Sequence, residues 1–277
     1  MTVPYFYKNS NSRFLSIEGG DSNEFLQNLI TNDINKCSED NILYSCLLSP
    51  QGKFLSDFFI FKKDKRYLIE THSLFYEKLL KKLNLYKLRA KVNINKVNNL
   101  YSYSVFGELH KDQDTFIFNT DPRNKNIGSK LIHLKKNPKI LDHFNEINEE
   151  KYHQILIQNI VPLSHYDLEE NKSLLLENNF ENLNSISWDK GCYVGQEITA
   201  RMKYRALLKK KIYSLEIKDG LPIIGQQIKD DENEFGKIIS IKNDSLLAML
   251  KIELAEKKIN TKQQIKTNEG VILKFIL

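Results

Sequence analysis

The sequence predicts an α+β protein whose last part is a small β-barrel. Both helical and strand patterns of apolar residues occur before Arg205, whereas short alternating runs separated by glycines follow it. The chain of 277 residues is long enough for two or three packed units. We therefore expect one region over residues 1–205 and a barrel over residues 206–277.

The first predicted elements are a short helix and a hairpin. Asp21 followed by Glu24 is typical of a helix start with a capping box, and apolar residues then recur at helical spacing. Two apolar runs, residues 42–48 and 54–61, flank the sequence Ser49-Pro50-Gln51-Gly52. Proline at the second position and glycine at the fourth predict a tight turn between two strands.

A strand over residues 67–71 and a helix over residues 75–83 are expected next. Residues 86–94 then alternate between polar and apolar side chains, which predicts another strand. That strand would place three cations on one face, namely Lys87, Arg89 and Lys91. Such a face is either solvated or receives an anion.

The remaining elements are a helix over residues 149–158, which ends before Pro162, and the barrel strands. Asp121-Pro122-Arg123, together with Gly128, indicates a loop that precedes this helix. The predicted barrel strands are short alternating runs with glycines between or beside them: residues 213–217, 235–241, 246–252 and 271–277.

Composition excludes several classes of protein. The net charge is +6, but the chain has 35 lysines and only 6 arginines. This ratio is typical of proteins encoded by an AT-rich genome, so the net charge is poor support for nucleic-acid binding. No apolar run is long enough to cross a membrane, and the N-terminus lacks the pattern of a secretory signal. Three scattered cysteines and six dispersed histidines predict neither disulfides nor a metal site. We expect a cytoplasmic protein without membrane contact.

The segment Lys190-Gly191-Cys192-Tyr193-Val194-Gly195-Gln196-Glu197 is the strongest functional signal. Two glycines bracket Cys192, and a helix is expected to start at Gln196. The positive end of a helix and the charge of Lys190 both favour the thiolate, which is the nucleophilic form. Cys46 is expected to be buried and inert, and Cys37 lies in a polar loop. We therefore predict that Cys192 is a working thiol.

This segment resembles the signature of the YgfZ family of folate-binding proteins, which is related to the glycine-cleavage T-protein, an aminomethyltransferase. The likeness extends over most of the chain. The further similar stretches are Lys203-Tyr204-Arg205 and residues 21–33, 48–57, 86–92 and 121–123.

The resemblance implies a ring of two interleaved α+β subdomains followed by the barrel, with tetrahydrofolate in the central opening. It implies that the carboxylate of Glu177 binds the pterin. The alternative for this residue is a solvated carboxylate without a ligand. The rest of the implied folate site comes from the motif: Tyr193, Gly195, Gln196, Glu197 and Arg201. The cations Arg89, Lys87 and Lys203 would meet the glutamate tail of folate or an RNA phosphate.

One departure bears on the activity. The T-protein has an aspartate that positions folate, and residues 71–78 contain none. The resemblance therefore implies support of iron–sulfur enzymes, including those that thiolate tRNA, with Cys192 as a redox or transfer thiol and Lys190 beside it. Two alternatives stay open: a folate-dependent one-carbon transferase, and a tRNA-binding module that uses the basic strand and the cations Lys209, Lys210 and Lys211.

Overall fold

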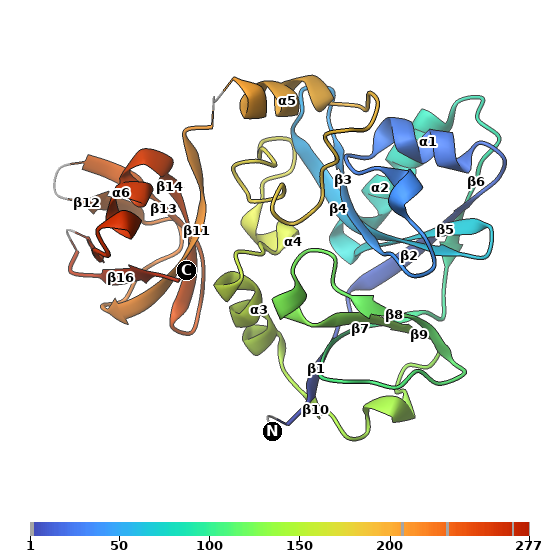
Figure 1. The fold of residues 1–277 in the computed structure, drawn as a ribbon, viewed down its shortest axis with the longest axis horizontal. Helices are drawn as coiled ribbons and strands as arrows, with labels where there is room; N and C mark the ends of the chain where they lie inside the picture. Colours follow the sequence, from blue (N-terminus) through green and yellow to red (C-terminus); the bar gives the residue numbers. More distant parts are fainter. Residues whose placement is uncertain (1–2, 206–207, 231–232, 268, 277) are drawn as a thin grey trace.

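The computed structural model describes residues 3–205, 208–230, 233–267 and 269–276, which form two five-stranded sheets and a barrel-like sheet of six strands (Figure 1). The first sheet has the order β3-β4-β5-β2-β6, and all its pairs are antiparallel. Its strands are β2 (Ser12–Glu18), β3 (Leu43–Leu48), β4 (Phe54–Lys63), β5 (Arg66–His72) and β6 (Asn93–Val97).

Two helices cover one face of the first sheet. They are α1 (Ser22–Leu29) and α2 (Ser73–Lys87), whose apolar stripes form one core with the strands. The opposite face packs against the middle of the chain in a second core that contains Phe54, Phe180 and Leu156. Because both faces are covered, every residue of β3 is buried. The later segments of the chain therefore pack against a sheet whose own core is closely packed.

The second sheet has the order β10-β1-β7-β9-β8. Its strands are β1 (Tyr5–Lys8), β7 (Tyr101–Phe106), β8 (Thr115–Thr120), β9 (Ser129–His133) and β10 (Asn145–Glu146). The chain therefore starts in the second sheet, crosses to build the first sheet, and returns. This path confirms the expected pair of interleaved α+β subdomains.

The strand predicted over residues 86–94 is wrong. The helix α2 continues to Lys87, and β6 begins only at Asn93, where Glu18 of β2 pairs with it. Leu83 and Tyr86 pack into the core at the spacing of a helix, and this packing outweighs the alternating pattern. The three cations at positions 87, 89 and 91 consequently do not share a face of a sheet.

The C-terminal sheet nearly closes into the expected barrel. Its order is β12-β13-β14-β11-β16-β15, and the two edge strands approach each other. The strands are β11 (Lys210–Asp219), β12 (Gln227–Asp230), β13 (Asn233–Lys242), β14 (Ser245–Lys251), β15 (Ile265–Lys266) and β16 (Ile272–Phe275), with α6 (Ile252–Asn260) between β14 and β15. The division before residue 206 stays a prediction, because residue 206 lies outside the described residues, as does residue 277 of the last predicted strand.

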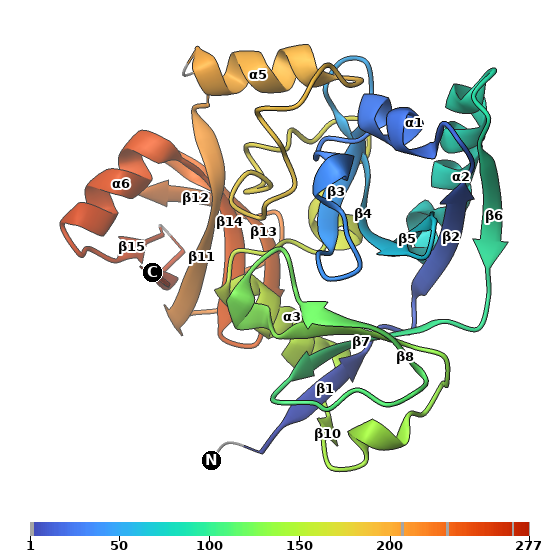
Figure 2. The same cartoon turned by 45° about the vertical axis from the view of Figure 1, so that its right-hand side comes forward.

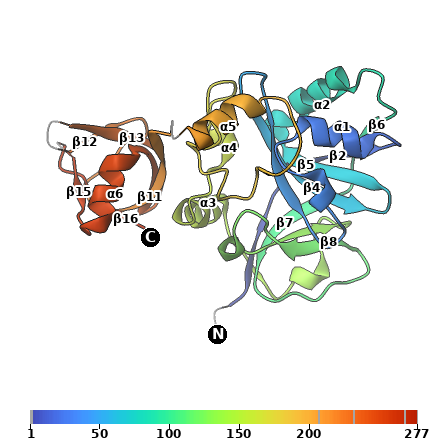
Figure 3. The ribbon, with the colours of Figure 1, turned by 45° about the horizontal axis from the view of Figure 1, so that its top comes forward.

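The middle of the chain joins the three sheets. The helix α3 (Glu149–Gln158) has the predicted bounds, and Ile157 packs against Ile212 and Leu247 of the barrel. The short α4 (Ser164–Asp167) follows, and a long irregular segment then leads to α5 (Gln196–Tyr204). Figures 2 and 3 show this middle part between the barrel and the two sheets. Among the described helices, none is both long and apolar enough to span a membrane.

Candidate functional site

Cys192 lies in a loop that leads into α5. We call residues 190–195 the thiol loop. The side chain of Cys192 is exposed, and only Tyr193, Val194 and Gly195 separate it from the first residue of the helix. Figure 1 shows α5 above the irregular segment, between the barrel and the first sheet. The predicted position of the thiol shortly before a helix start is therefore confirmed.

Lys190, the first residue of the thiol loop, is buried. Its Nζ donates hydrogen bonds to the backbone carbonyls of Gln27, Ile30 and Asn32 at 2.6, 2.7 and 2.9 Å. An ammonium group has three protons, so these carbonyls use all of them. Burial lowers the pKa of Lys190 to about 8, and the nearby carboxylate of Asp33 opposes this change. The predicted action of the Lys190 charge on the thiol stays a prediction.

The end of α1 and the residues that follow it also bind the chain on both sides of Lys190. The amide of Val194 donates to the carbonyl of Asn28 at 3.3 Å, and the amide of Ser187 donates to the carbonyl of Thr31 at 3.0 Å. The hydroxyl of Thr31 in turn donates to the carbonyl of Ser185 at 2.6 Å. The approach to the thiol loop is thus hydrogen-bonded to the end of α1 along several residues.

Gly195 anchors the other end of the thiol loop. Its φ is 82°, and a Cβ at this position would lie 2.5 Å from the carbonyl oxygen of Ser49 and 3.1 Å from the Cα of Gly52. Both the left-handed backbone and the close contact require glycine. Gly191 differs, because a Cβ there would meet nothing within 4 Å. The prediction that both glycines permit a tight backbone therefore holds only for Gly195.

Three separate motifs of the sequence meet at the thiol loop. Residues 21–33 supply α1 and the carbonyls that bind Lys190, residues 48–57 supply the turn against Gly195, and residues 190–197 supply the loop itself. A loop with both ends fixed presents its middle residue at a defined place. Here that residue is the exposed Cys192.

The other two cysteines are buried. Burial raises the pKa of the Cys37 thiol to about 12 and that of the Cys46 thiol well above its ordinary value. Cys46 is the buried strand residue that the sequence predicts. The polar surroundings predicted for Cys37 are wrong, since the residue is buried and its Sγ donates a hydrogen bond to the carbonyl oxygen of Ile60 in β4 at 3.5 Å. Cys192 is the one exposed thiol of the three.

The residues predicted to bind folate fall into separate places. Tyr193 is buried in the thiol loop, and its ring centre lies 5.0 Å from Nζ of Lys190. Gln196 opens α5, and Glu197 pairs with Arg201 at 3.0 Å on the exposed face of that helix. The structure thus divides the motif residues between the thiol loop and α5.

Glu177 and Arg89 lie elsewhere. Glu177 is half-buried and lines a hollow against the barrel, where its carboxylate lies 3.8 Å from Nζ of Lys210. Burial raises its pKa, and the charges of Lys210 and Lys53 oppose the change. Arg89 is exposed beyond the end of α2 and lines a surface hollow beside α1.

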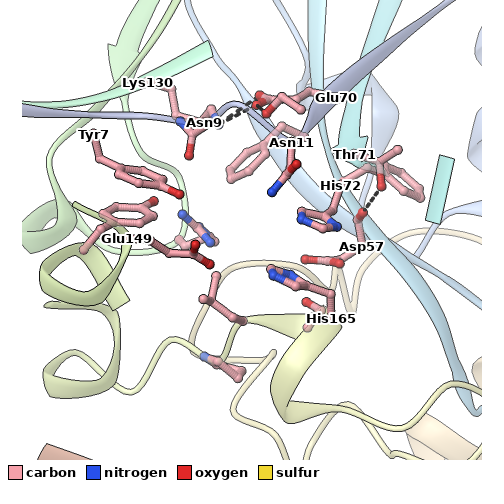
Figure 4. A pocket seen from close by; sticks show the side chains of 18 residues that line it. Tyr7, Asn9, Asn11, Asp57, Glu70, Thr71, His72, Lys130, Glu149 and His165 are labelled. Carbon is pink, nitrogen blue, oxygen red and sulfur yellow. Dashed lines mark hydrogen bonds and ion pairs between the residues drawn. The ribbon is translucent and has the colours of Figure 1, made fainter. Parts of the chain in front are cut away.

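A pocket lies between the two subdomains (Figure 4), and its volume of about 110 Å³ is many times the space that one water needs. We call it the central pocket. Its wall includes the stacked rings of Tyr7 and Tyr152, whose centres are 4.2 Å apart, and three carboxylates, Asp57, Glu70 and Glu149. The buried hydroxyl of Ser164 at its edge has no hydrogen-bond partner among the described residues.

Two histidines stack face to face in the central pocket. The ring centres of His72 and His165 are 3.7 Å apart and their planes differ by 7°. Burial lowers the pKa of both, to about 4 for His165, where the nearby His72 adds to the shift and Asp167 opposes it. Both imidazoles are therefore neutral at physiological pH. Figure 4 shows them beside Asp57, whose charge opposes the lowering of the His72 pKa.

Two buried ion pairs support the pocket wall. Nζ of Lys130 lies 2.9 Å from a carboxylate oxygen of Glu70, and Arg123 forms two parallel hydrogen bonds with Asp121 at 3.0 and 2.8 Å. Sequence reasoning assigned no role to Glu70 or Lys130, because each is a single charged residue within a strand. Among the described residues, no group of histidine, cysteine or acidic side chains is arranged to hold a metal ion.

Comparison with known proteins agrees with the fold. The model of the GCVT N-terminal domain matches residues 8–107. The solved structure of glycine cleavage system aminomethyltransferase T from Bartonella henselae superposes with a TM-score of 0.71 and 11% identity, over 98% of this chain and 84% of that chain. The chain therefore has the fold of the glycine-cleavage T-protein.

Several similar sequences carry the same name. The chain is 28% identical to the mitochondrial iron–sulfur cluster assembly factor IBA57 homolog of Neurospora crassa, over 74% of this chain and 52% of that protein. It is 27% identical to mitochondrial iron–sulfur cluster assembly factor IBA57 of Homo sapiens, over 76% and 66%. The chain thus spans between half and two thirds of these relatives. The expected cytoplasmic location is wrong on this comparison, because the relatives are named as mitochondrial proteins.

Proposed function

We propose that this chain is a YgfZ-type accessory factor in the assembly of iron–sulfur proteins, and that Cys192 is its redox or transfer thiol. One observation carries the proposal: the exposed cysteine of the chain stands on a loop that is fixed at both ends. A thiolate is the form of cysteine that binds iron and attacks sulfur. The names of the relatives support the same assignment.

In this proposal the cluster or its partner protein is the substrate. The two buried cysteines lie in the core and cannot meet a partner, so only one ligand of a cluster comes from this chain. The remaining ligands belong to the partner or to a small thiol. The clients are iron–sulfur enzymes, among them the enzymes that thiolate tRNA.

Complementation tests this function in cells that lack the native protein. Cys192→Ser should leave iron–sulfur enzyme activity unrestored while the variant keeps the melting temperature of the wild type, because an exposed sulfur makes few packing contacts. Cys46→Ala is the matched control, since it removes a buried sulfur and should complement. Full complementation by Cys192→Ser would show that the thiol is not needed for the function.

We further propose that tetrahydrofolate binds in the central pocket. The polar groups of the pocket fit a pterin. Asp57 and Glu149 accept hydrogen bonds from its amino and ring N–H groups, and the unpartnered hydroxyl of Ser164 gains a partner. Neutral His72 and His165 leave the carboxylates of the pocket free to accept hydrogen bonds from the ring. Bound folate would supply one-carbon chemistry, while these residues hold and orient it.

Calorimetric titration with a stable reduced folate, 5-formyltetrahydrofolate, tests this placement. Asp57→Asn should weaken binding by about 1.5–3 kcal/mol, the range for a hydrogen bond to a charged group. Glu177→Gln is the comparison, because that residue lines the other hollow. If Glu177→Gln weakened folate binding and Asp57→Asn did not, the pterin would bind in the hollow beside the barrel instead. Consumption of folate during the assay would instead identify a one-carbon transferase.

A further inference from the structure

We propose that Lys190 is a positioning residue, whose ammonium ties the thiol loop to the carboxyl end of α1 and so fixes the place of Cys192. This inference rests on the proposed function of Cys192, and it assigns to Lys190 a different role from activation of the thiol.

The hydrogen bonds of Lys190 leave nothing for the thiol. Three carbonyl oxygens, those of Gln27, Ile30 and Asn32, lie 2.6–2.9 Å from Nζ. A lysine ammonium has three protons and no further donor. Its charge is compensated by these carbonyl dipoles and by the neighbouring Asp33.

The end of α1 needs such a group. The carbonyls of the last turn of a helix have no partners within the helix, and cations stabilise them. The last turn of α1 contains no basic residue, and its cap, Ile30, has an extended backbone rather than the left-handed glycine that often closes a helix. Lys190 supplies the missing cation from a position 160 residues further along the chain.

The link also fixes the thiol loop. Cys192 follows Lys190 by two residues, so its Cα lies no more than about 7 Å from that of Lys190. On the other side, the amide of Val194 is bonded to Asn28, and Gly195 is packed on the turn that contains Gly52. Loss of the ammonium would free one end of the loop while the other end stayed in place.

Alkylation of Cys192 separates positioning from activation. The rate of reaction with iodoacetamide would be followed against pH for the wild type and for Lys190→Met, which keeps the apolar stem but removes the ammonium. If Lys190 positions the loop, the midpoint of the pH profile stays within about 0.3 unit, since no strong charge effect on the thiol is lost. Amide hydrogen exchange at residues 27–34 and 192–195 should accelerate at least tenfold.

Two further variants complete the experiment. Lys36→Met is the matched control, because Lys36 is an exposed cation near Asp33, and this variant should change neither measurement. Lys190→Arg keeps the charge, but a planar guanidinium does not match three carbonyls that converge on a tetrahedral ammonium. It should accelerate exchange as Lys190→Met does, and it provides folded protein if the methionine variant does not accumulate.

The opposite pattern would overturn the inference. If Lys190→Met raises the midpoint of Cys192 alkylation by about 0.5 unit or more, and Lys190→Arg restores it without faster exchange, then the charge acts on the thiol. Unchanged exchange in both variants would also exclude positioning. Neither result depends on iron–sulfur assembly, so failure of this inference is distinguishable from complementation by Cys192→Ser.

Discussion

Gly195 of the thiol loop lies directly against the turn that contains Gly52, and neither position has room for a side chain. A Cβ on Gly195 would approach the carbonyl oxygen of Ser49 to 2.5 Å, and a Cβ on Gly52 would approach the Cβ of Ile198 to 2.8 Å. The thiol loop and the hairpin turn of the first sheet are therefore fitted to each other through their backbones.

Gly195→Ala should destabilise the protein by about 1–3 kcal/mol, because it combines a left-handed backbone with a contact on a carbonyl oxygen. Urea denaturation measures the loss. Gly191→Ala is the control in the same loop, since its Cβ would meet nothing within 4 Å and its φ lies outside the left-handed region. Equal stability of the two alanine variants would contradict the packing described here.

Cys192 should be alkylated at least about tenfold faster than the other two cysteines at pH 7.5. Burial raises the pKa of Cys37 and Cys46 and also keeps reagents away, whereas Cys192 is exposed. Peptide mass spectrometry after short exposure to iodoacetamide gives the three rates. The difference should disappear in 8 M urea, and a Cys37 that reacts as fast as Cys192 in native protein would exclude this burial.

The buried pair of Asp121 and Arg123 should be strongly coupled. Removing one partner leaves an uncompensated charge in the core, which costs about 3–5 kcal/mol. We therefore expect Asp121→Asn and Arg123→Met each to lower the free energy of unfolding by this amount. The double variant should cost clearly less than the sum. Additive effects in urea denaturation would show that the two side chains do not depend on each other.

His165 should make the protein less stable as the pH falls from 6.5 to 4. In this interval the unfolded chain binds a proton that the folded chain excludes, since the pKa of His165 in the folded state is about 4. The loss of unfolding free energy over this interval is about 1–2 kcal/mol once solvent screening of the partly exposed ring is allowed for. Above pH 6.5 none of this stability is lost.

Comparison of variants isolates this contribution from that of the carboxylates. His165→Phe keeps an aromatic ring over His72 but cannot bind a proton, so its unfolding free energy should depend less steeply on pH than that of the wild type. His110→Gln is the control, because His110 is exposed. The same slope in all three proteins would show that His165 does not titrate in this way.

Local patterns predicted the elements whose contacts are also local. The helix over residues 149–158 has the predicted bounds, because its N-cap Asn148 and its apolar spacing are both in the sequence. The segment over residues 86–94 was assigned wrongly, since two patterns compete there. Alternation favours a strand, but burial of Leu83 and Tyr86 extends α2, and pairing with β2 sets where β6 begins.

The site was predictable only in part for the same reason. The motif identified Cys192 and the helix after it, both of which depend on neighbouring residues. The partners of Lys190 are backbone carbonyls of α1, which no sequence pattern reveals. Cys37 has polar neighbours in the sequence, yet its sulfur points into the core. The stacking of His72 on His165 likewise joins residues from two distant elements.

The two fixed ends of the thiol loop restrict how Cys192 can work. Few residues lie between the anchors at Lys190 and Gly195, and each residue of chain spans at most about 3.6 Å. The sulfur can therefore move only a few ångströms while both anchors hold, so it cannot act as a swinging arm that carries cargo between distant sites. Any partner has to bring its own reacting atom to within bonding distance of a stationary sulfur.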